Sequence, residues 1–530
     1  MSTTGSLRLM KLVLRRDRFR LPLWWAGLVG LMAVSAQSIH SLYGTDEAAR
    51  TYVSTVGHNP ALEMFAGPGY GFDRPTPGVV LVNETSLWLA LATGLMSVFL
   101  VNRHTRAEEE SERTDLIRSA VVGRHAPAVA ALAVVGAANV AVAAGVALVT
   151  LPFGFPVAGT VALAASIGLT GMAFAAATAV AAQVVGTGRA SAGLGSALLL
   201  LAFVVRGIGD VRLAALSWLT PFGWGIGVRA YAGERWWALG GLVLFTAAEV
   251  ALALWLSSRR DLGRGLLPER PGPARADALT LHPLGLAWRL QRGWVAGWAV
   301  GVFLAGLVYG SVANDVEAMV ADNPQLADYL EQVAGASLAD AYLATAVRML
   351  GLAVGGFAVA SALRNRSEES VGHAEMLLAA PVSRWRWGSA HVVVTVAAAA
   401  VLVALAGLGT GLAYAQSSGD AGQVARLTLA GLASGPAVLV MAGIATAMFG
   451  WLPRATLGTW AAFALFAVVQ LFATMLRLPH WLTLLSPFGH VPTVPAEPWR
   501  AVPLVVLAVL GAGLVGAGLA GFRGRDLAVA

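Results

Sequence analysis

The sequence RNRSEESVGHAEMLLAAPVSR, from Arg364 to Arg384, is a short charged segment between two long apolar runs. It is rich in strong helix formers, and the helical pattern ends at Pro381. Apolar runs of about 20 residues, long enough to cross a bilayer as a helix, recur on both sides of it. The stretch therefore predicts an all-α polytopic membrane protein that holds a polar helix at the membrane surface.

Composition supports this fold class. The chain has 530 residues, of which 57% are hydrophobic and 12% are charged. A soluble protein carries about twice that share of charged residues. The net charge of +7 comes almost entirely from arginines in loops beside the apolar runs, which fits the positive-inside rule and not a nucleic-acid-binding surface. The absence of cysteine excludes disulfides, thiolate metal sites and cysteine nucleophiles.

A weaker copy of the charged segment, RHTRAEEESERTDLIRSAVVGR, lies at Arg103–Arg124. It begins with a capping-box pattern, Thr105 followed by Glu108. Each copy contains a Glu-Glu-Ser triplet, an acidic residue, an apolar pair and a closing arginine. These are Glu109–Ser111, Asp115, Leu116, Ile117 and Arg124 in the first copy, and Glu368–Ser370, Glu375, Met376, Leu377 and Arg384 in the second.

Two further motifs repeat. Leu219–Gly223, LTPFG, matches Leu485–Gly489, LSPFG, before the last apolar run of each half. Arg-Asp-Leu follows that run at Arg260–Leu262 and at Arg525–Leu527. Fixed motifs in the same order indicate an internal repeat. Because about six spans per half is an even number, the two halves are predicted to have the same orientation.

We expect a first six-span half at 1–256, a cytoplasmic linker rich in arginine and proline at 257–282, and a second six-span half at 283–530. The predicted spans lie near 21–42, 79–101, 126–151, 157–185, 190–208 and 236–256, and near 293–312, 340–363, 387–413, 425–451, 456–476 and 502–522. The positive-inside rule places both termini and both charged segments in the cytoplasm. The Arg-over-Lys, Ala-rich and Gly-rich composition suggests a bacterial inner (plasma) membrane.

The N-terminus allows two interpretations. Leu7–Arg20 is basic and amphipathic, as interfacial helices are. The apolar Leu21–Met32 and the small residues Ala33–Ala36 that follow also resemble a cleavable signal peptide. An uncleaved first span is favoured, because a similar run follows an arginine pair in mid-chain, at Arg289–Val312.

Nucleotide and metal chemistry have no visible motif. A P-loop needs Gly-x-x-x-x-Gly-Lys-Ser/Thr, and Lys11, the only lysine, has no such context. Neither a Gly-x-Ser-x-Gly nor a His-Glu-x-x-His motif is present. His373 beside Glu375 reads as ordinary polar surface. We therefore predict no enzyme activity, no catalytic residue, no metal and no cofactor in this chain.

The two charged segments carry the functional signal. A single segment could be only a solvated loop, but two helix-prone copies after the second span of each half favour docking to a soluble partner. The candidate docking residues combine acidic and apolar side chains with one arginine. They are Glu108, Glu109, Glu112, Asp115, Glu368, Glu369, Glu375, Met376, Leu377 and Arg384.

The second segment resembles a known family motif. Glu368–Ser370 with Ala374–Arg384, AEMLLAAPVSR, is similar to the Glu-rich coupling-helix signature of ABC-2-type transporter permeases, ELLL-x-x-Pro-Val-Ser-Arg. The basic lead-in resembles that family's connecting helix. Two fused six-span units resemble the permeases of polyketide-antibiotic, tetronasin-type exporters.

This resemblance implies an interfacial connecting helix and a cytoplasmic coupling helix in each half. It further implies a permease that exports amphipathic compounds such as antibiotics, drugs or lipids. ATP and magnesium would be bound by two copies of a separate ABC ATPase, one on each coupling helix. The first copy of the motif lacks Pro-Val-Ser, so the two docking sites are expected to be unequal.

Polar residues inside spans are candidates for the translocation path, because charges there are costly. They are Glu249, Arg348, Gln37, Asn83 and Glu84. The alternative for such residues is a hydrogen bond between helices. Two rival functions stay open: a proton-coupled twelve-span secondary transporter in which Glu249 titrates, and a membrane scaffold that recruits a soluble partner without transport.

Overall fold

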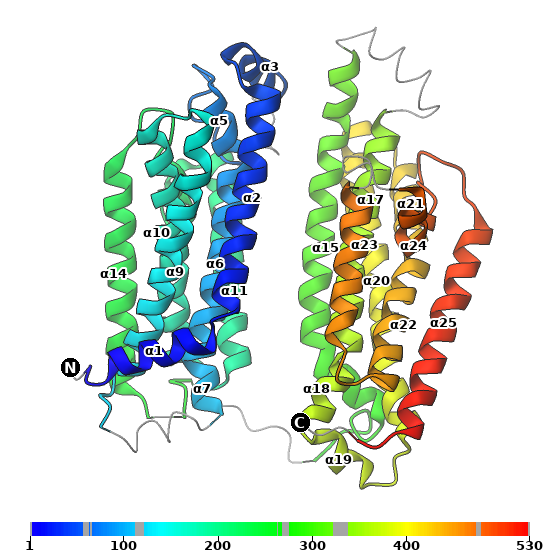
Figure 1. Ribbon diagram of the computed structural model, residues 1–530. Helices are drawn as coiled ribbons and strands as arrows, with labels where there is room; N and C mark the ends of the chain where they lie inside the picture. Colours follow the sequence, from blue (N-terminus) through cyan, green and yellow to red (C-terminus); the bar gives the residue numbers. More distant parts are fainter. Residues whose placement is uncertain are drawn as a thin grey trace. The chain divides into compact units, whose positions relative to one another are not determined.

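The computed structural model describes residues 3–56, 63, 66–111, 121–261, 263–267, 275–321, 338–472 and 479–527. All regular structure in these ranges is helical. The chain divides into two compact units, Met1–Gly272 and Pro273–Ala530, and the division lies within the predicted linker. Each unit is a bundle of long helices with shorter helices at its ends (Figure 1).

Unit 1 has α10 at its centre, in contact with α6, α9, α11 and α14. Its helices are α1 (Ser6–Arg16), α2 (Arg20–Tyr43), α3 (Asp46–Val56), α5 (Pro77–Leu81), η1 (Val82–Ser86), α6 (Leu87–His104), α7 (Arg106–Glu110), α9 (Ala126–Thr150), η2 (Leu151–Phe153), α10 (Val157–Val184), α11 (Gly188–Arg212), α12 (Ala214–Ser217), α13 (Pro221–Gly227) and α14 (Trp236–Arg259).

Unit 2 is built around α17 and α20, which contact each other and α22. Its helices are α15 (Pro283–Ala321), α17 (Leu338–Ala362), α18 (Arg364–Ser370), α19 (His373–Leu378), α20 (Arg384–Ser418), α21 (Gly422–Ala433), α22 (Gly435–Trp451), α23 (Leu457–Phe472), α24 (His480–Leu485), η3 (Pro487–His490) and α25 (Ala501–Gly524).

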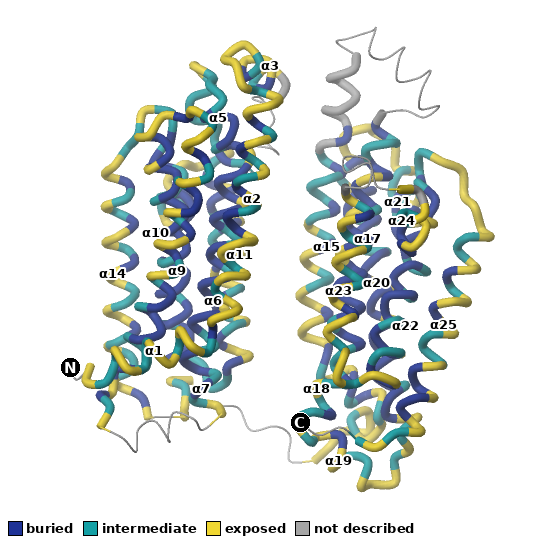
Figure 2. Tube along the Cα trace, viewed as in Figure 1, coloured by how far each residue is buried: buried dark blue, intermediate teal, exposed yellow. Residues whose placement is uncertain are grey.

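Eleven helical segments in the described residues are long and apolar enough to cross a membrane. They match eleven of the predicted spans, and at the remaining position, 456–476, lies the shorter apolar helix α23. The long helices at the edge of each unit expose large apolar side chains, such as Leu244 on α14 and Val502 on α25, whereas α10 and α17 are mostly buried (Figure 2). Apolar side chains on the outside of a bundle suit contact with lipid. The chain is a polytopic membrane protein.

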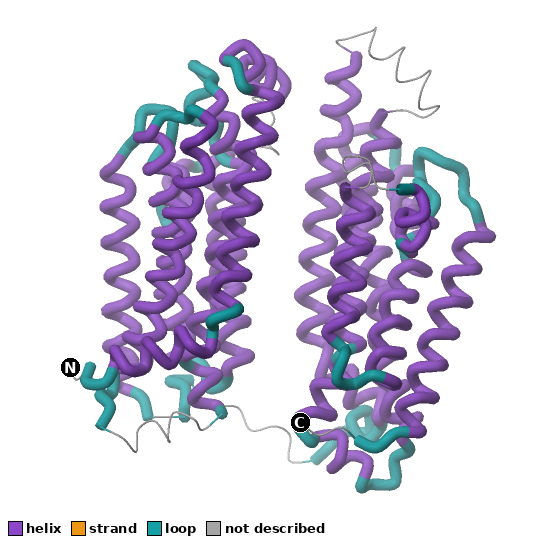
Figure 3. Tube along the Cα trace, viewed as in Figure 1, coloured by secondary structure: helices purple, strands orange, loops and turns teal. Residues whose placement is uncertain are grey.

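Loops gather at the two ends of each bundle (Figure 3). In unit 1, the helix is interrupted between α1 and α2, where Asp17 follows the last residue of α1. The buried Asp17 carboxylate is 3.1 Å from the Nε atom of Arg103 and also contacts His104. The basic lead-in therefore forms a separate amphipathic helix. In unit 2, the lead-in residues that follow Pro283 are continuous with the span, since α15 runs unbroken to Ala321.

Close packing in unit 2 depends on glycine. A Cβ atom on Gly450 of α22 would lie 1.9 Å from the carbonyl oxygen of Gly518 on α25, and one on Gly443 would lie 2.8 Å from that of Gly511. The second pair lies seven residues, or about two helical turns, before the first on both helices, so the same faces of α22 and α25 meet at both levels. Small residues that let backbones approach are a common way to join helices in membranes.

Candidate docking segments and polar groups of the spans

In the described residues, a short helix, α7, follows the second span of unit 1, and two short helices, α18 and α19, follow the second span of unit 2. In unit 1, α7 follows α6 after a kink at Thr105. The predicted capping box is wrong, because the Thr105 hydroxyl donates to the carbonyl oxygen of Val101 at 2.7 Å and does not cap α7. In unit 2, α18 and α19 are separated by Gly372, whose φ of 87° lies in the left-handed region that favours glycine.

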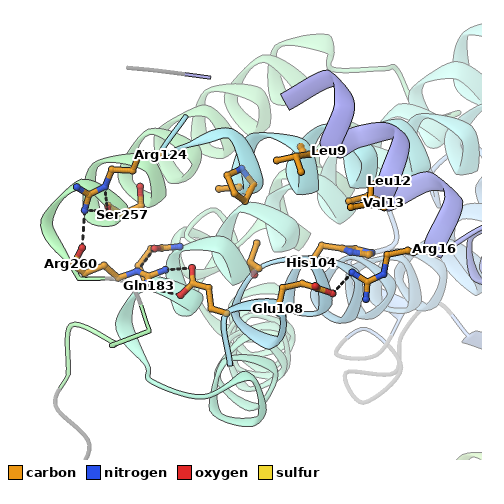
Figure 4. Close-up of a pocket in the computed structure, with 15 residues that line it drawn as sticks. Leu9, Leu12, Val13, Arg16, His104, Glu108, Arg124, Gln183, Ser257 and Arg260 are labelled. Carbon is orange, nitrogen blue, oxygen red and sulfur yellow. Dashed lines mark hydrogen bonds and ion pairs between the residues drawn. The ribbon is translucent and has the colours of Figure 1, made fainter. Parts of the chain in front are cut away.

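In unit 1, a partly buried ion pair ties α7 to the residue after the last span. The guanidinium of Arg260 donates to both carboxylate oxygens of Glu109, at 2.5 and 2.9 Å. Arg106 donates to the same carboxylate at 2.8 Å, and Arg124 donates to the carbonyl oxygen of Arg260 at 2.8 Å. Gln183 accepts from the Nε atom of Arg260 at 2.6 Å (Figure 4).

Unit 2 contains the same arrangement. Arg525 donates to both carboxylate oxygens of Glu369, at 2.6 and 2.9 Å, and Arg366 lies 3.4 Å from that carboxylate. Arg384 donates to the carbonyl oxygen of Arg525. We call these two sets of residues the arginine clamps: Arg106, Glu109, Arg124 and Arg260 in unit 1, and Arg366, Glu369, Arg384 and Arg525 in unit 2.

The clamps show that the two Glu-Glu-Ser triplets do not correspond residue by residue, contrary to the pairing expected from the sequence. Glu109 is the first residue of its Glu-Glu-Ser triplet, whereas its counterpart Glu369 is the second of its own. The two triplets are therefore offset by one residue in space. Sequence reasoning did not assign a role to Arg260 or Arg525, although the repeated Arg-Asp-Leu motif was the signal that could have pointed to them.

The clamps separate the candidate docking residues into two groups. Glu109 and Glu369 are engaged within the chain, and the Glu369 side chain is fully buried. Glu375 and Met376 are exposed at the end of unit 2, and 70% of Met376 is accessible. Leu377 packs partly buried against the apolar cluster around Phe522. Glu112 and Asp115 lie outside the described residues.

The remaining two acidic candidates hold local structure. Glu108 lies 2.5 Å from Arg16, so α1 is joined to α7 by an ion pair. A cavity of about 70 Å³ lies between α1 and the clamp of unit 1. Leu9 and Leu12 line it on one side, and Glu108 and Arg260 line it on the other (Figure 4). Glu368 lies 3.2 Å from Arg364 and 2.9 Å from His373.

The structure brings two of the path candidates together. Asn83 and Glu84 lie in η1, a turn of π-helix at the start of the second span. The hydroxyl of Tyr52 on α3 lies 2.8 Å from the side-chain oxygen of Asn83 and 2.5 Å from the Glu84 carboxylate. Burial, together with the charge of Glu84, raises the pKa of Tyr52 above its ordinary range. π-Helical turns are frequent at functional sites.

The other path candidates lie on three different helices. Gln37 is exposed on α2. Glu249 on α14 belongs to unit 1 and Arg348 on α17 to unit 2. Within the described residues, one carboxylate oxygen of Glu249 and the Nε atom of Arg348 are buried without a hydrogen-bond partner.

The whole chain is similar to a protein of Mycobacterium tuberculosis. It is 38% identical over 529 residues to the multidrug efflux system permease protein Rv1217c of Mycobacterium tuberculosis, and the match covers 99% of this chain and 95% of that protein. The chain belongs to the Rv1217c permease family. The profile of the family's C-terminal domain, named for the multidrug efflux system permease Rv1217c, also matches residues 281–523.

The C-terminal profile covers α15 to α25, which is nearly all of unit 2. The full-length match extends over unit 1 as well, so both arginine clamps lie inside the part of the chain that is shared with the relative.

Proposed function

We propose that the chain is the transmembrane subunit of an ABC-2-type exporter that moves amphipathic drugs, antibiotics or lipids out of a bacterial cell. The name of the relative, a multidrug efflux permease, supports efflux as the direction of transport. ATP hydrolysis is assigned to two copies of a separate ATPase, because the sequence lacks a P-loop lysine. The spans lie in the inner membrane, with both termini in the cytoplasm.

The observation that carries this proposal is the duplicated arginine clamp. In each unit, a short helix after the second span is held by a bidentate Arg–Glu pair to the residue that follows the last span. Bidentate charge-assisted pairs are strong and fix orientation. A partner that pushes on the short helix therefore moves two spans of the unit together.

The docking surface itself is assigned to exposed residues next to the clamp of unit 2. Val371 and Met376 are 65% and 70% accessible, and Glu375 is exposed beside them. An apolar patch with an acidic neighbour on a short helix suits insertion into a groove on a soluble protein. Glu369 contributes from inside, because it sets the position of this surface and does not touch the partner.

The rival with a specific observation in its favour is a proton-driven transporter. One oxygen of the Glu249 carboxylate is buried within the span α14 and has no partner among the described residues. Acidic groups inside spans often serve proton transfer. This rival requires transport without any ATPase.

The test is to express the tagged chain with its neighbouring gene products, to purify it and to identify bound ATPases. We expect an ATPase to co-purify with the natural chain. It should also co-purify with the control variant Glu47→Arg, which reverses an exposed charge at the end of unit 1 that lies away from α7 (Figure 1). The double variant Glu375→Arg with Met376→Glu should hold the ATPase copy at unit 2 about tenfold less tightly and leave the copy at unit 1 in place. Absence of any bound ATPase, or export that continues without one, would refute the proposal.

A further inference from the structure

An open pocket of about 390 Å³ lies between α17 and the segment α23–η3 of unit 2, next to an arginine of a membrane span. Thr345, Arg348 and Met349 of α17 form one wall. Gln470 of α23, Thr483 of α24 and Gly489 of η3 form the other. Its size is that of a small-molecule site, and its lining combines a few polar groups with apolar side chains.

Among the residues that the structure describes, Arg348 has no counter-ion at ion-pair distance. A guanidinium in a membrane span is costly unless a negative group pairs with it. Among the described residues no carboxylate lies within ion-pair distance of Arg348, and its Nε atom is buried without a hydrogen-bond partner. Glu497 is the one described carboxylate whose charge acts on Arg348, and it lies 3.9 Å from Arg500 instead.

Two other arginines of the predicted spans, Arg426 and Arg206, are paired with a carboxylate. On α17 itself, the Asp340 carboxylate is engaged by both terminal nitrogens of Arg426, each at 2.8 Å. In unit 1, the buried Arg206 lies 2.9 Å from Asp210 on the same helix. These two arginines each have a carboxylate partner, whereas Arg348 lines a pocket.

We propose that this pocket binds the carboxylate of an acidic amphipathic substrate, with Arg348 as the group that recognises it. The planar fork of a guanidinium matches a carboxylate with two parallel hydrogen bonds. Met349, Val469 and Leu471, which also line the pocket, provide apolar contact for the rest of the molecule. This inference rests on the proposed transport function and names one class of compound that the permease carries.

The test measures binding to the full-length chain in nanodiscs of phosphatidylcholine, without ATPase or ATP. The probes are 11-(dansylamino)undecanoic acid and its methyl ester, which differ only in the charged group. We expect the acid to bind the natural chain about tenfold more tightly than the ester. Equal affinities for acid and ester would overturn the proposal. Because this comparison uses only the natural chain, it does not depend on whether a variant folds.

Variants then assign the effect to one residue. Arg348→Gln should remove the preference for the acid and leave ester binding unchanged, which also shows that the pocket is intact. Arg348→Lys should keep part of the preference, because lysine has the charge without the fork. Arg454→Gln, the same loss of charge at an exposed loop position, should behave as the natural chain. If Arg348→Gln weakens both probes equally, its role is structural and the proposal fails.

The membrane is a second source of anionic groups. Nanodiscs that contain phosphatidylglycerol distinguish it: displacement of the acid from the natural chain by this lipid would assign the pocket to a headgroup and refute a substrate site. Because the assay uses no ATPase, its failure leaves the exporter proposal to the co-purification test. Conversely, loss of the ATPase in that test would not change the binding result.

Discussion

Glu369 and Glu375 are acidic residues of the same segment, but only Glu369 is buried. Substitution of the two residues is therefore expected to change the stability of the chain by different amounts. The Glu369 carboxylate is fully buried and accepts both donors of Arg525, whereas Glu375 is exposed. Breaking a buried ion pair from one side leaves an uncompensated charge, which costs about 3–5 kcal/mol. Changing an exposed group usually costs less than about 0.5 kcal/mol.

We therefore expect Glu369→Gln to destabilise the chain strongly, because the Arg525 guanidinium loses its charged partner. Thermal unfolding in detergent should show a clear fall in the midpoint. Glu375→Gln, the same substitution six positions later in the sequence, is the matched control and should unfold as the natural chain does. Equal midpoints for the two variants would mean that the clamp of unit 2 does not form.

Asp17 is the second residue whose surroundings predict a clear effect. Its carboxylate is buried between Arg103 and His104, at the junction of α1 and α2. Without it, the two basic groups lose their shared partner and α1 loses its attachment to the end of α6. We expect Asp17→Ala to release α1, so that trypsin cleaves at Arg15 or Arg16 several times faster.

The control for this experiment is Asp46→Ala, which removes an exposed carboxylate at the start of α3. Its cleavage pattern should match that of the natural chain. If Asp17→Ala is also cleaved at the natural rate, the ion pair of Arg16 with Glu108 is enough to hold α1 in place.

At the scale of elements, the contact of α22 with α25 depends on glycine. A side chain at Gly450 would meet the backbone of Gly518, which cannot move aside without separating the helices. Gly450→Val should therefore destabilise unit 2 by more than about 3 kcal/mol, through overpacking at a backbone contact. Gly513→Val on α25, where a Cβ atom meets nothing within 4 Å, is the control and should be nearly neutral.

Thermal unfolding of the two glycine variants decides this point. A similar midpoint for Gly450→Val and Gly513→Val would show that α25 does not lie against α22 in the membrane. This matters for the clamp, because Arg525 follows directly after α25 and also donates to the carbonyl oxygen of Gly450 at 3.1 Å.

The elements also show what sequence can and cannot predict. The spans could be predicted from the length of the apolar runs, because each run must cover the bilayer. The segments between the spans could be predicted from their charged residues. The clamp partners could not be derived, since Glu109 and Arg260 are far apart in the chain and only a repeated motif hinted at their roles. The same limit hid Tyr52, which joins Asn83 and Glu84 from a neighbouring helix.

Short-range breaks were also difficult to predict. The basic lead-ins of the two units look alike in composition, yet α1 ends before the first span whereas α15 is continuous. The difference depends on a tertiary contact: Asp17 leaves the helix to meet Arg103 and His104. Periodicity carries no information on such a contact.

At the scale of the whole molecule, the two units share the clamp and several motifs but differ around them. Both units keep the clamp, but only unit 2 has the Pro-Val-Ser sequence before its closing arginine. In unit 2 the short helix α19 carries the exposed Glu375 and Met376. Two unequal docking sites for identical ATPases follow from the proposed function.

We therefore predict two ATPase copies on each natural chain and one copy when only the unit 2 surface is changed. The double variant Glu375→Arg with Met376→Glu removes the exposed acidic and apolar contacts of unit 2 and leaves both clamps intact, so the fold and the unit 1 site are preserved. Native mass spectrometry of the purified complex counts the copies directly. Retention of two copies would place docking elsewhere in unit 2, and loss of both would mean that the ATPases bind only as a pair.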